Sequence, residues 1–152
     1  MFLSIPAFII VAAILFPNLL FIIFPPRDTP PALPASPKWI DALEQGGRIL
    51  FILIFILYPD SGKTGYSLLL LCMILTAVSY YVLWIRYIVK GRRFQSLFEP
   101  VLSLPIPMAI FPLLSFTFGC LWLEKWIAFI PLACFAFGHT VNSLQSAKAI
   151  DL

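Results

Sequence analysis

The chain has 152 residues, of which 61% are hydrophobic and only 11% are charged, and its formal net charge is +3 at pH 7. This composition excludes an ordinary soluble domain and indicates a membrane protein in which one bundle of helices uses the whole chain. The basic residues form no clustered face with solvent-facing aromatic residues, so nucleic acid is not an expected partner. The three cysteines are scattered through apolar stretches without a C-x-x-C pair, so we expect no disulfide framework, no metal site and no cofactor.

The first predicted membrane span covers residues 2–24. It lacks the basic start and the small-residue cleavage site of a signal peptide, and its apolar run is too long for one, so we expect it to be retained. Pro6 and Pro17 predict kinks in this helix. Asn18 directly follows the second proline, where it can satisfy backbone groups that the proline frees.

The second predicted span covers residues 37–58, with Ser36 as its N-cap and Pro37 at its first helical position. Its uninterrupted apolar run, residues 49–58, covers about 15 Å of helix, whereas the hydrocarbon core of a bilayer is about 30 Å thick. To cross the membrane, the helix must therefore also use the segment before this run. This places Glu44 and Arg48 below the headgroups.

Glu44 and Arg48 lie four positions apart, in the order that favours an ion pair on a helix. Two interpretations of the pair remain open: both side chains snorkel to the interface, or both line a polar pocket between helices. The neighbouring Gly46 and Gly47 agree with either interpretation, because small residues let another helix approach closely.

Three further spans are predicted, at residues 66–89, 100–121 and 126–146. The first of them ends in aromatic and basic residues, which places Trp84 and Tyr87 at the membrane interface. The second contains four prolines and should be broken or strongly bent. The short connection after it predicts a tight antiparallel pair with the last span. The four prolines are Pro100, Pro105, Pro107 and Pro112.

The sequence therefore predicts an all-α polytopic membrane protein, a bundle of five transmembrane helices with a proline-kinked fourth helix. In this topology seven lysines and arginines lie on the side of the C-terminus, whereas Lys63 and Lys125 lie on the other side. The positive-inside rule then places the N-terminus outside and the C-terminus in the cytoplasm. Short loops without a eukaryotic sorting signal favour the plasma membrane of a bacterium.

Polar residues gather in the cytoplasmic third of this bundle. His139, Asn142 and Ser143 share one face of the last span, because they follow helical spacing. We expect a cytoplasm-facing intramembrane pocket whose titratable groups are Glu44, Arg48 and His139. Alternatively, His139 and Asn142 only hold neighbouring helices together, and Tyr80 and Tyr81 anchor the protein at the membrane interface. The other candidate pocket residues are Asn18, Tyr80, Tyr81, Arg86, Asn142 and Ser143.

Common catalytic motifs are absent: the chain has one histidine and no G-x-S-x-G elbow, P-loop or dinucleotide-binding fingerprint. The favoured function is binding or carrying a small amphiphilic or anionic molecule, with its polar end against Arg48. The alternative is an accessory subunit that meets a membrane-protein partner. A third interpretation, an intramembrane enzyme with a Glu–His acid–base pair, has no recognisable nucleophile, so no catalytic residue is assigned. Membrane lipids are expected partners in every case.

Overall fold

The computed structural model describes residues 3–31, 35–60, 65–101 and 103–150. The structure is all-helical, with 74% of residues in helices and no strand among the described residues. Three helical segments are long and apolar enough to cross a membrane: Ile5–Ile23, Leu68–Val89 and Trp126–Lys148. The all-α class is thus confirmed, and these segments fit a membrane protein. The predicted membrane spans at residues 37–58 and 100–121 stay predictions.

The first apolar segment consists of α1 (Ile5–Leu15), the 3-10 helix η1 (Phe16–Asn18) and α2 (Leu19–Ile23). Ser4 caps α1, since its Oγ accepts a hydrogen bond from the Ala7 N–H over 3.2 Å. Pro6 lies in the first turn, where no backbone N–H is needed, so the kink predicted there is wrong. Pro17 lies in η1, where the helix tightens because proline offers no N–H to an α-helical hydrogen bond.

The helix that carries Glu44 and Arg48 is α3 (Lys38–Leu57). Its N-cap is Pro37, and the side chain of Ser36 instead donates a hydrogen bond to Gln145 Oε1 over 2.8 Å. The predicted cap was therefore wrong by one residue, because Ser36 finds a tertiary partner. The helix ends at Leu57 with Tyr58 as its C-cap, as the turn residues after Tyr58 predict.

Two long helices and two short ones complete most of the chain: α4 (Leu68–Val89), η2 (Phe94–Leu97), η3 (Trp126–Ala128) and α6 (Phe129–Lys148). Ser67 caps α4 through a hydrogen bond from the Leu70 N–H. Together, η3 and α6 form the last apolar segment, which agrees with the expected position of the last span.

The proline-rich helix is α5 (Pro107–Trp122), which begins seven residues later than the predicted start at Pro100. Pro100 and Pro105 lie outside it, because a proline inside a helix removes a hydrogen bond and clashes with the preceding turn. Pro107 is tolerated in the first turn, after Ile106 with a left-handed φ of 42°. Pro112 does lie inside α5, as predicted.

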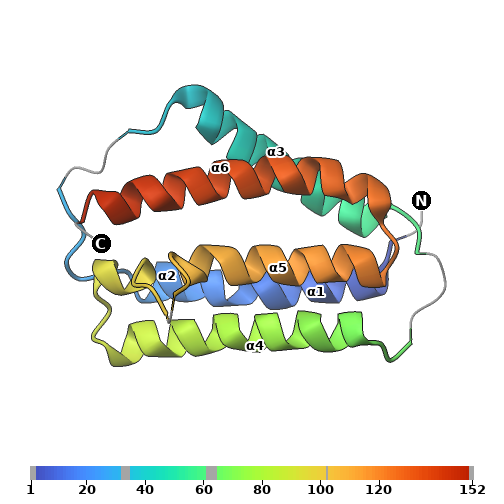
Figure 1. The fold of residues 1–152 in the computed structure, drawn as a ribbon, viewed down its shortest axis with the longest axis horizontal. Helices are drawn as coiled ribbons and strands as arrows, with labels where there is room; N and C mark the ends of the chain where they lie inside the picture. Colours follow the sequence, from blue (N-terminus) through green and yellow to red (C-terminus); the bar gives the residue numbers. More distant parts are fainter. Residues whose placement is uncertain (1–2, 32–34, 61–64, 102, 151–152) are drawn as a thin grey trace.

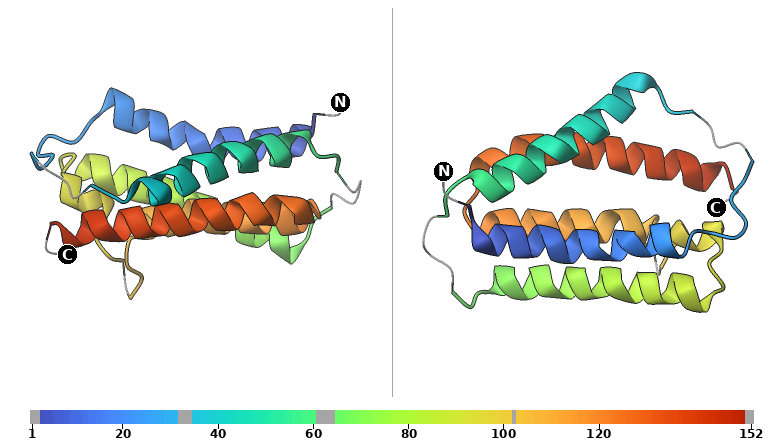
Figure 2. Two further views of the ribbon diagram at one scale, coloured as in Figure 1. Left: turned by 90° about the horizontal axis from the view of Figure 1, so that it is seen from above. Right: turned by 180° about the vertical axis from the view of Figure 1, so that it is seen from behind.

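The helices form two antiparallel pairs that share one bundle (Figure 1). The most extensive packing joins α3 to α6 and α4 to α5, and α5 also packs against α6. The α1 helix lies along α5 and contacts α3, as the view from behind shows (Figure 2). The N-terminus, the end of α3 and the start of α4 lie at one end of the bundle, here called the N-terminal end. The start of α3, η2 and the C-terminus lie at the other, the C-terminal end (Figure 1).

A cluster of aromatic and aliphatic side chains forms the core where α1, α3, α5 and α6 meet. Phe51 and Phe55 of α3 are fully buried, and the Phe51 ring contacts Phe116 edge-on at 4.9 Å between centroids. Trp84 and Tyr87 are buried as well. Both pack inside the bundle, where η2 and the residue after α2 cover this part of α4, and their predicted depth at the membrane interface stays a prediction.

A buried lysine joins three segments at the N-terminal end. Lys125 is 0% exposed, its Nζ lies 2.9 Å from Asp60 Oδ1, and it donates a hydrogen bond to the Tyr58 carbonyl over 2.5 Å. Ser4 Oγ donates to the same Asp60 oxygen over 2.6 Å. These contacts fix the start of α1, the end of α3 and the turn after α5 to one another.

Candidate ligand-binding site

The site is built on a close crossing of α3 and α6. A Cβ atom added to Gly47 would lie 2.6 Å from the Phe135 backbone nitrogen, and one added to Gly138 would lie 2.8 Å from the Glu44 backbone nitrogen. Real Cβ atoms do not approach this closely, so the two backbones can touch only because both positions are glycine. Gly46, next along α3, has nothing within 4 Å of the added Cβ and takes no part in the crossing.

This crossing presses the Glu44 side chain against α6, where both of its oxygens find partners. Oε1 lies 2.9 Å from His139 Nδ1, and Oε2 accepts a hydrogen bond from Asn142 Nδ2 over 2.5 Å. Asn142 Nδ2 also lies 3.0 Å from Asp41 Oδ1, one turn earlier on α3. Glu44 is only 8% exposed. Two helices are therefore held together by a carboxylate, an imidazole and an amide.

The predicted ion pair between Glu44 and Arg48 does not form. Glu44 is turned towards α6, and the Arg48 guanidinium donates a hydrogen bond to Gln45 Oε1 on its own helix. Among the described residues, no carboxylate oxygen lies within ion-pair distance of Arg48. Arg48 as a residue is half-buried, and its guanidinium is free of any ion pair with the described carboxylates, so it can bind a ligand.

Arg48 lines a cavity of about 450 Å³ in the half of the bundle nearer the C-terminal end. All long helices of the bundle and η2 contribute to it. The apolar part of the wall is supplied by Ile14, Leu15, Phe21, Leu97, Phe98, Met108, Ala109, Pro112, Phe116 and Phe135. The polar part is supplied by Asn18, Arg48, Tyr80, Trp84, His139 and Ser143.

Hydrogen-bond donors dominate the polar wall. Trp84 also lines the cavity, but it is only 5% exposed and its Nε1 atom is itself buried, so it offers the cavity no accessible donor. The Tyr80 hydroxyl donates to Asn18 Oδ1, which leaves the amide N–H groups of Asn18 for other partners. Arg48 carries only donors. Such a set favours a ligand group that accepts hydrogen bonds, and an anionic group most of all.

The predicted pocket residues fall into three places. Asn18, Arg48, Tyr80, His139 and Ser143 line the cavity. Glu44 and Asn142 lie behind His139, at the crossing of α3 and α6. Tyr81 and Arg86 lie elsewhere: the Tyr81 hydroxyl donates to the Ala13 carbonyl over 2.7 Å beside an apolar groove between α1 and α4.

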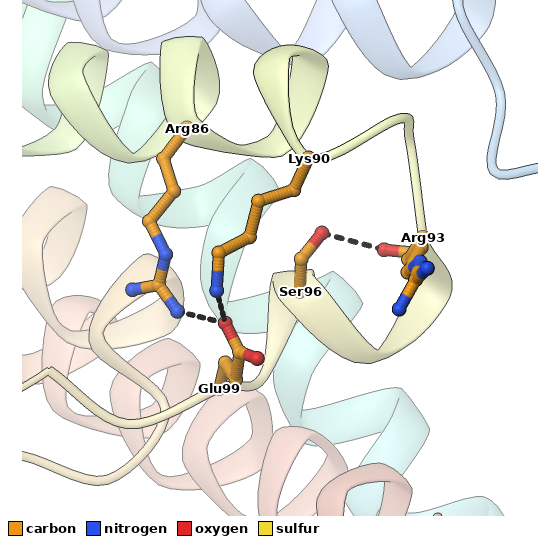
Figure 3. A network of polar contacts seen from close by, with 5 residues as sticks. All are labelled: Arg86, Lys90, Arg93, Ser96 and Glu99. Atoms are coloured by element: carbon orange, nitrogen blue, oxygen red, sulfur yellow. Dashed lines mark hydrogen bonds and ion pairs between the residues drawn. The ribbon is translucent and has the colours of Figure 1, made fainter.

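Arg86 belongs to a separate ionic cluster. It lies one turn before Lys90 on α4, and both side chains reach the Glu99 carboxylate, which follows η2 (Figure 3). Hydrogen bonds from Lys90 and then from Arg86 hold the pKa of the Glu99 carboxyl below its ordinary value. The cluster therefore fastens the connection between α4 and α5 onto α4, and leaves Arg86 no role at the cavity.

Trp84 and Asp41 were missing from the predicted site. Trp84 follows Tyr80 by four residues and therefore shares its helix face, which is a signal that the sequence offered. Asp41 precedes Glu44 by three residues and shares its face in the same way. The contribution of Leu97 and Phe98 has no such signal, because it depends on how η2 folds back over α4 and α5.

Within the described ranges, no three His, Cys, Asp or Glu side chains lie close enough together to hold a metal ion. No family model matches the chain, and the searches of curated proteins and of solved structures found no significant match either.

Proposed function

We propose that this protein binds a small amphiphile with an anionic headgroup in the cavity that α1, α3, α4, α5 and α6 line. The headgroup would contact Arg48, and the apolar part would lie among the phenylalanine side chains. One observation carries the proposal: Arg48, which has no carboxylate partner among the described residues, lines a cavity whose wall is otherwise largely apolar.

The energetic reason is that a charge is costly when it is left alone inside a membrane protein, where it usually marks a functional site. An oxyanion can satisfy Arg48 through charge-assisted hydrogen bonds. A cavity of about 450 Å³ also agrees with the usual size of small-molecule sites, about 300–1,000 Å³.

The proposal includes a topology of five spans, with α3 and α5 crossing the membrane beside the three apolar segments. The end of α4 lies at the C-terminal end of the bundle (Figure 1), with Arg86 in its last turn and Lys90 and Arg93 directly after it. The positive-inside rule therefore favours the cytoplasm for this end. The N-terminus would then be outside, and the cavity would take its ligand from the cytoplasmic side of the plasma membrane. The short loops favour a bacterial plasma membrane.

The test compares the wild type with Arg48→Met, each purified in mild detergent. Native mass spectrometry identifies bound small molecules, and thermal unfolding is followed with and without an added anionic amphiphile. We expect the wild type to carry a ligand that Arg48→Met loses while it stays folded. An added amphiphile at about one hundred times its Kd should stabilise the wild type by about 2.7 kcal/mol.

Arg93→Met is the matched control, because Arg93 is an exposed arginine that does not line the cavity. The proposal fails if no protein carries a ligand and if anionic and neutral amphiphiles of equal chain length stabilise the wild type equally. A stably co-purified membrane subunit in that case would favour the accessory-subunit interpretation.

A further inference from the structure

His139 connects the cavity to the buried carboxylate of Glu44. Its Nδ1 lies 2.9 Å from Glu44 Oε1, and its ring lines the cavity. The other Glu44 oxygen accepts from Asn142, so both oxygens of this carboxylate act as acceptors. The hydrogen-bond network thereby assigns the proton of the neutral imidazole to Nδ1.

This tautomer has a consequence for the second ring nitrogen. With a proton on Nδ1, Nε2 of the neutral ring carries a lone pair and can only accept a hydrogen bond. The lone pair on Nε2 would then repel the oxygen lone pairs of an anionic headgroup in the cavity. A second proton, taken up at Nε2, converts this nitrogen into a donor and places a positive charge in the same wall as Arg48.

We infer that the cavity takes up its anionic headgroup together with one proton, which binds at Nε2 of His139. This inference rests on the proposed function and adds the regulation of the same site. It also narrows the ligand to a group that accepts hydrogen bonds from both an arginine and an imidazolium, such as a carboxylate, sulfonate or phosphate.

The charges around His139 support the coupling. From α3, it faces Glu44 directly and Asp41 through Asn142, with Arg48 on the cavity side. Among the described residues, α1, η1, α2, η2 and α5 place no charged side chain on the cavity wall, and α4 contributes the hydroxyl of Tyr80. With His139 neutral, two carboxylates therefore oppose one guanidinium. Proton uptake balances them, which removes the repulsion that an incoming anion would meet.

The experiment measures the affinity of dodecyl sulfonate for the protein in phosphatidylcholine nanodiscs between about pH 5.5 and 8, the range in which histidine titrates. A sulfonate keeps its charge throughout this range, so any pH dependence belongs to the protein. Binding below the critical micelle concentration is followed by the fluorescence of Trp84, with Trp84→Phe as the spectroscopic blank. Dodecyl maltoside, a neutral amphiphile of equal chain length, is the matched ligand.

We expect the wild type to bind the sulfonate about 5- to 150-fold more tightly at pH 5.5 than at pH 8, the usual size of coupling between two sites. The affinity for the maltoside should not change. His139→Gln keeps a hydrogen-bond donor for Glu44 but cannot take up the proton, so its affinity for the sulfonate should be low and independent of pH. Arg48→Met should bind more weakly at every pH and keep the wild-type pH dependence.

Two results have different meanings. If the wild type binds the sulfonate equally at pH 5.5 and 8, or if His139→Gln keeps the full pH dependence, the proton coupling is wrong and the proposed function stands. If the wild type binds no sulfonate at any pH, the proposed function fails as well. The pH profile of the wild type decides between these outcomes even if His139→Gln does not fold.

Discussion

Glu99 shows how much one carboxylate can organise outside the helices. It receives hydrogen bonds from Lys90 and Arg86 and ties the connection between α4 and α5 to the end of α4 (Figure 3). Because this connection supplies Leu97 and Phe98 to the cavity wall, the ionic cluster supports the site without taking part in it.

The lowered pKa of Glu99 makes a prediction about pH. Relative to the ordinary value of 4.5, a lowered folded-state pKa means stability that is fully present above pH 4.5 and lost as the pH falls through the folded-state value. Glu99→Gln should therefore lower the free energy of unfolding by about 1 kcal/mol at pH 7. This difference from the wild type should shrink below about pH 4.5 and disappear at lower pH.

Thermal unfolding in detergent at a series of pH values measures this difference. Glu124→Gln is the control, since Glu124 is an exposed carboxylate with no ion pair among the described residues. If the loss of stability in Glu99→Gln stays constant down to pH 3, the charge of the Glu99 carboxylate does not contribute to stability and the prediction is wrong.

At the scale of the elements, the crossing of α3 and α6 depends on two glycines. Gly47→Ala and Gly138→Ala would each place a methyl group within 3 Å of the facing backbone, so the helices must move apart. We expect each variant to lose about 1–3 kcal/mol of stability, the usual cost of overpacking. Unfolding by titration with dodecyl sulfate in detergent micelles is a suitable measurement.

Gly46→Ala separates this effect from helix propensity. The added methyl group meets nothing within 4 Å, and alanine favours helix over glycine, so this variant should be neutral or slightly more stable. If all three variants lose stability equally, the close approach of the two helices is not what the glycines provide.

The limits of prediction from sequence can be seen in the same elements. The end of α3 followed from turn residues, and the shared face of His139 and Ser143 followed from helical spacing, because both are local properties of the chain. The partner of Glu44 could not be predicted in this way, since His139 lies far along the sequence and meets Glu44 only where α3 crosses α6. The start of α5 was misplaced because the prolines at 100 and 105 exclude a helix, whereas the one at 107 can begin it.

At the scale of the whole molecule, the proposed topology predicts on which side of the membrane each loop lies. In a chain whose Cys72, Cys120 and Cys134 are replaced by alanine, single cysteines at Tyr66→Cys and Gln95→Cys would flank α4, and both positions are exposed. A membrane-impermeant maleimide should label Tyr66→Cys in intact cells, and Gln95→Cys only after permeabilisation.

The reverse labelling pattern would invert the orientation and place the cavity towards the outside. Labelling of both positions in intact cells would mean that α4 does not cross the membrane. Equal expression and retained thermal stability of the two proteins, measured after purification, ensure that the labelling reports topology and not misfolding.

The pairing of α3 with α6 has a consequence for how the protein is made. On a ribosome, α3 emerges well before α6, and it carries the charged residues Asp41, Glu44 and Arg48. An arginine near the centre of an inserting helix costs about 2.5–3.5 kcal/mol. At that moment α3 has not yet met the groups of α6 that bind Glu44. If the proposed five-span topology holds, we therefore expect α3 to insert stably only after α6 has been made, so that a chain stalled before α6 would be degraded faster than the complete chain.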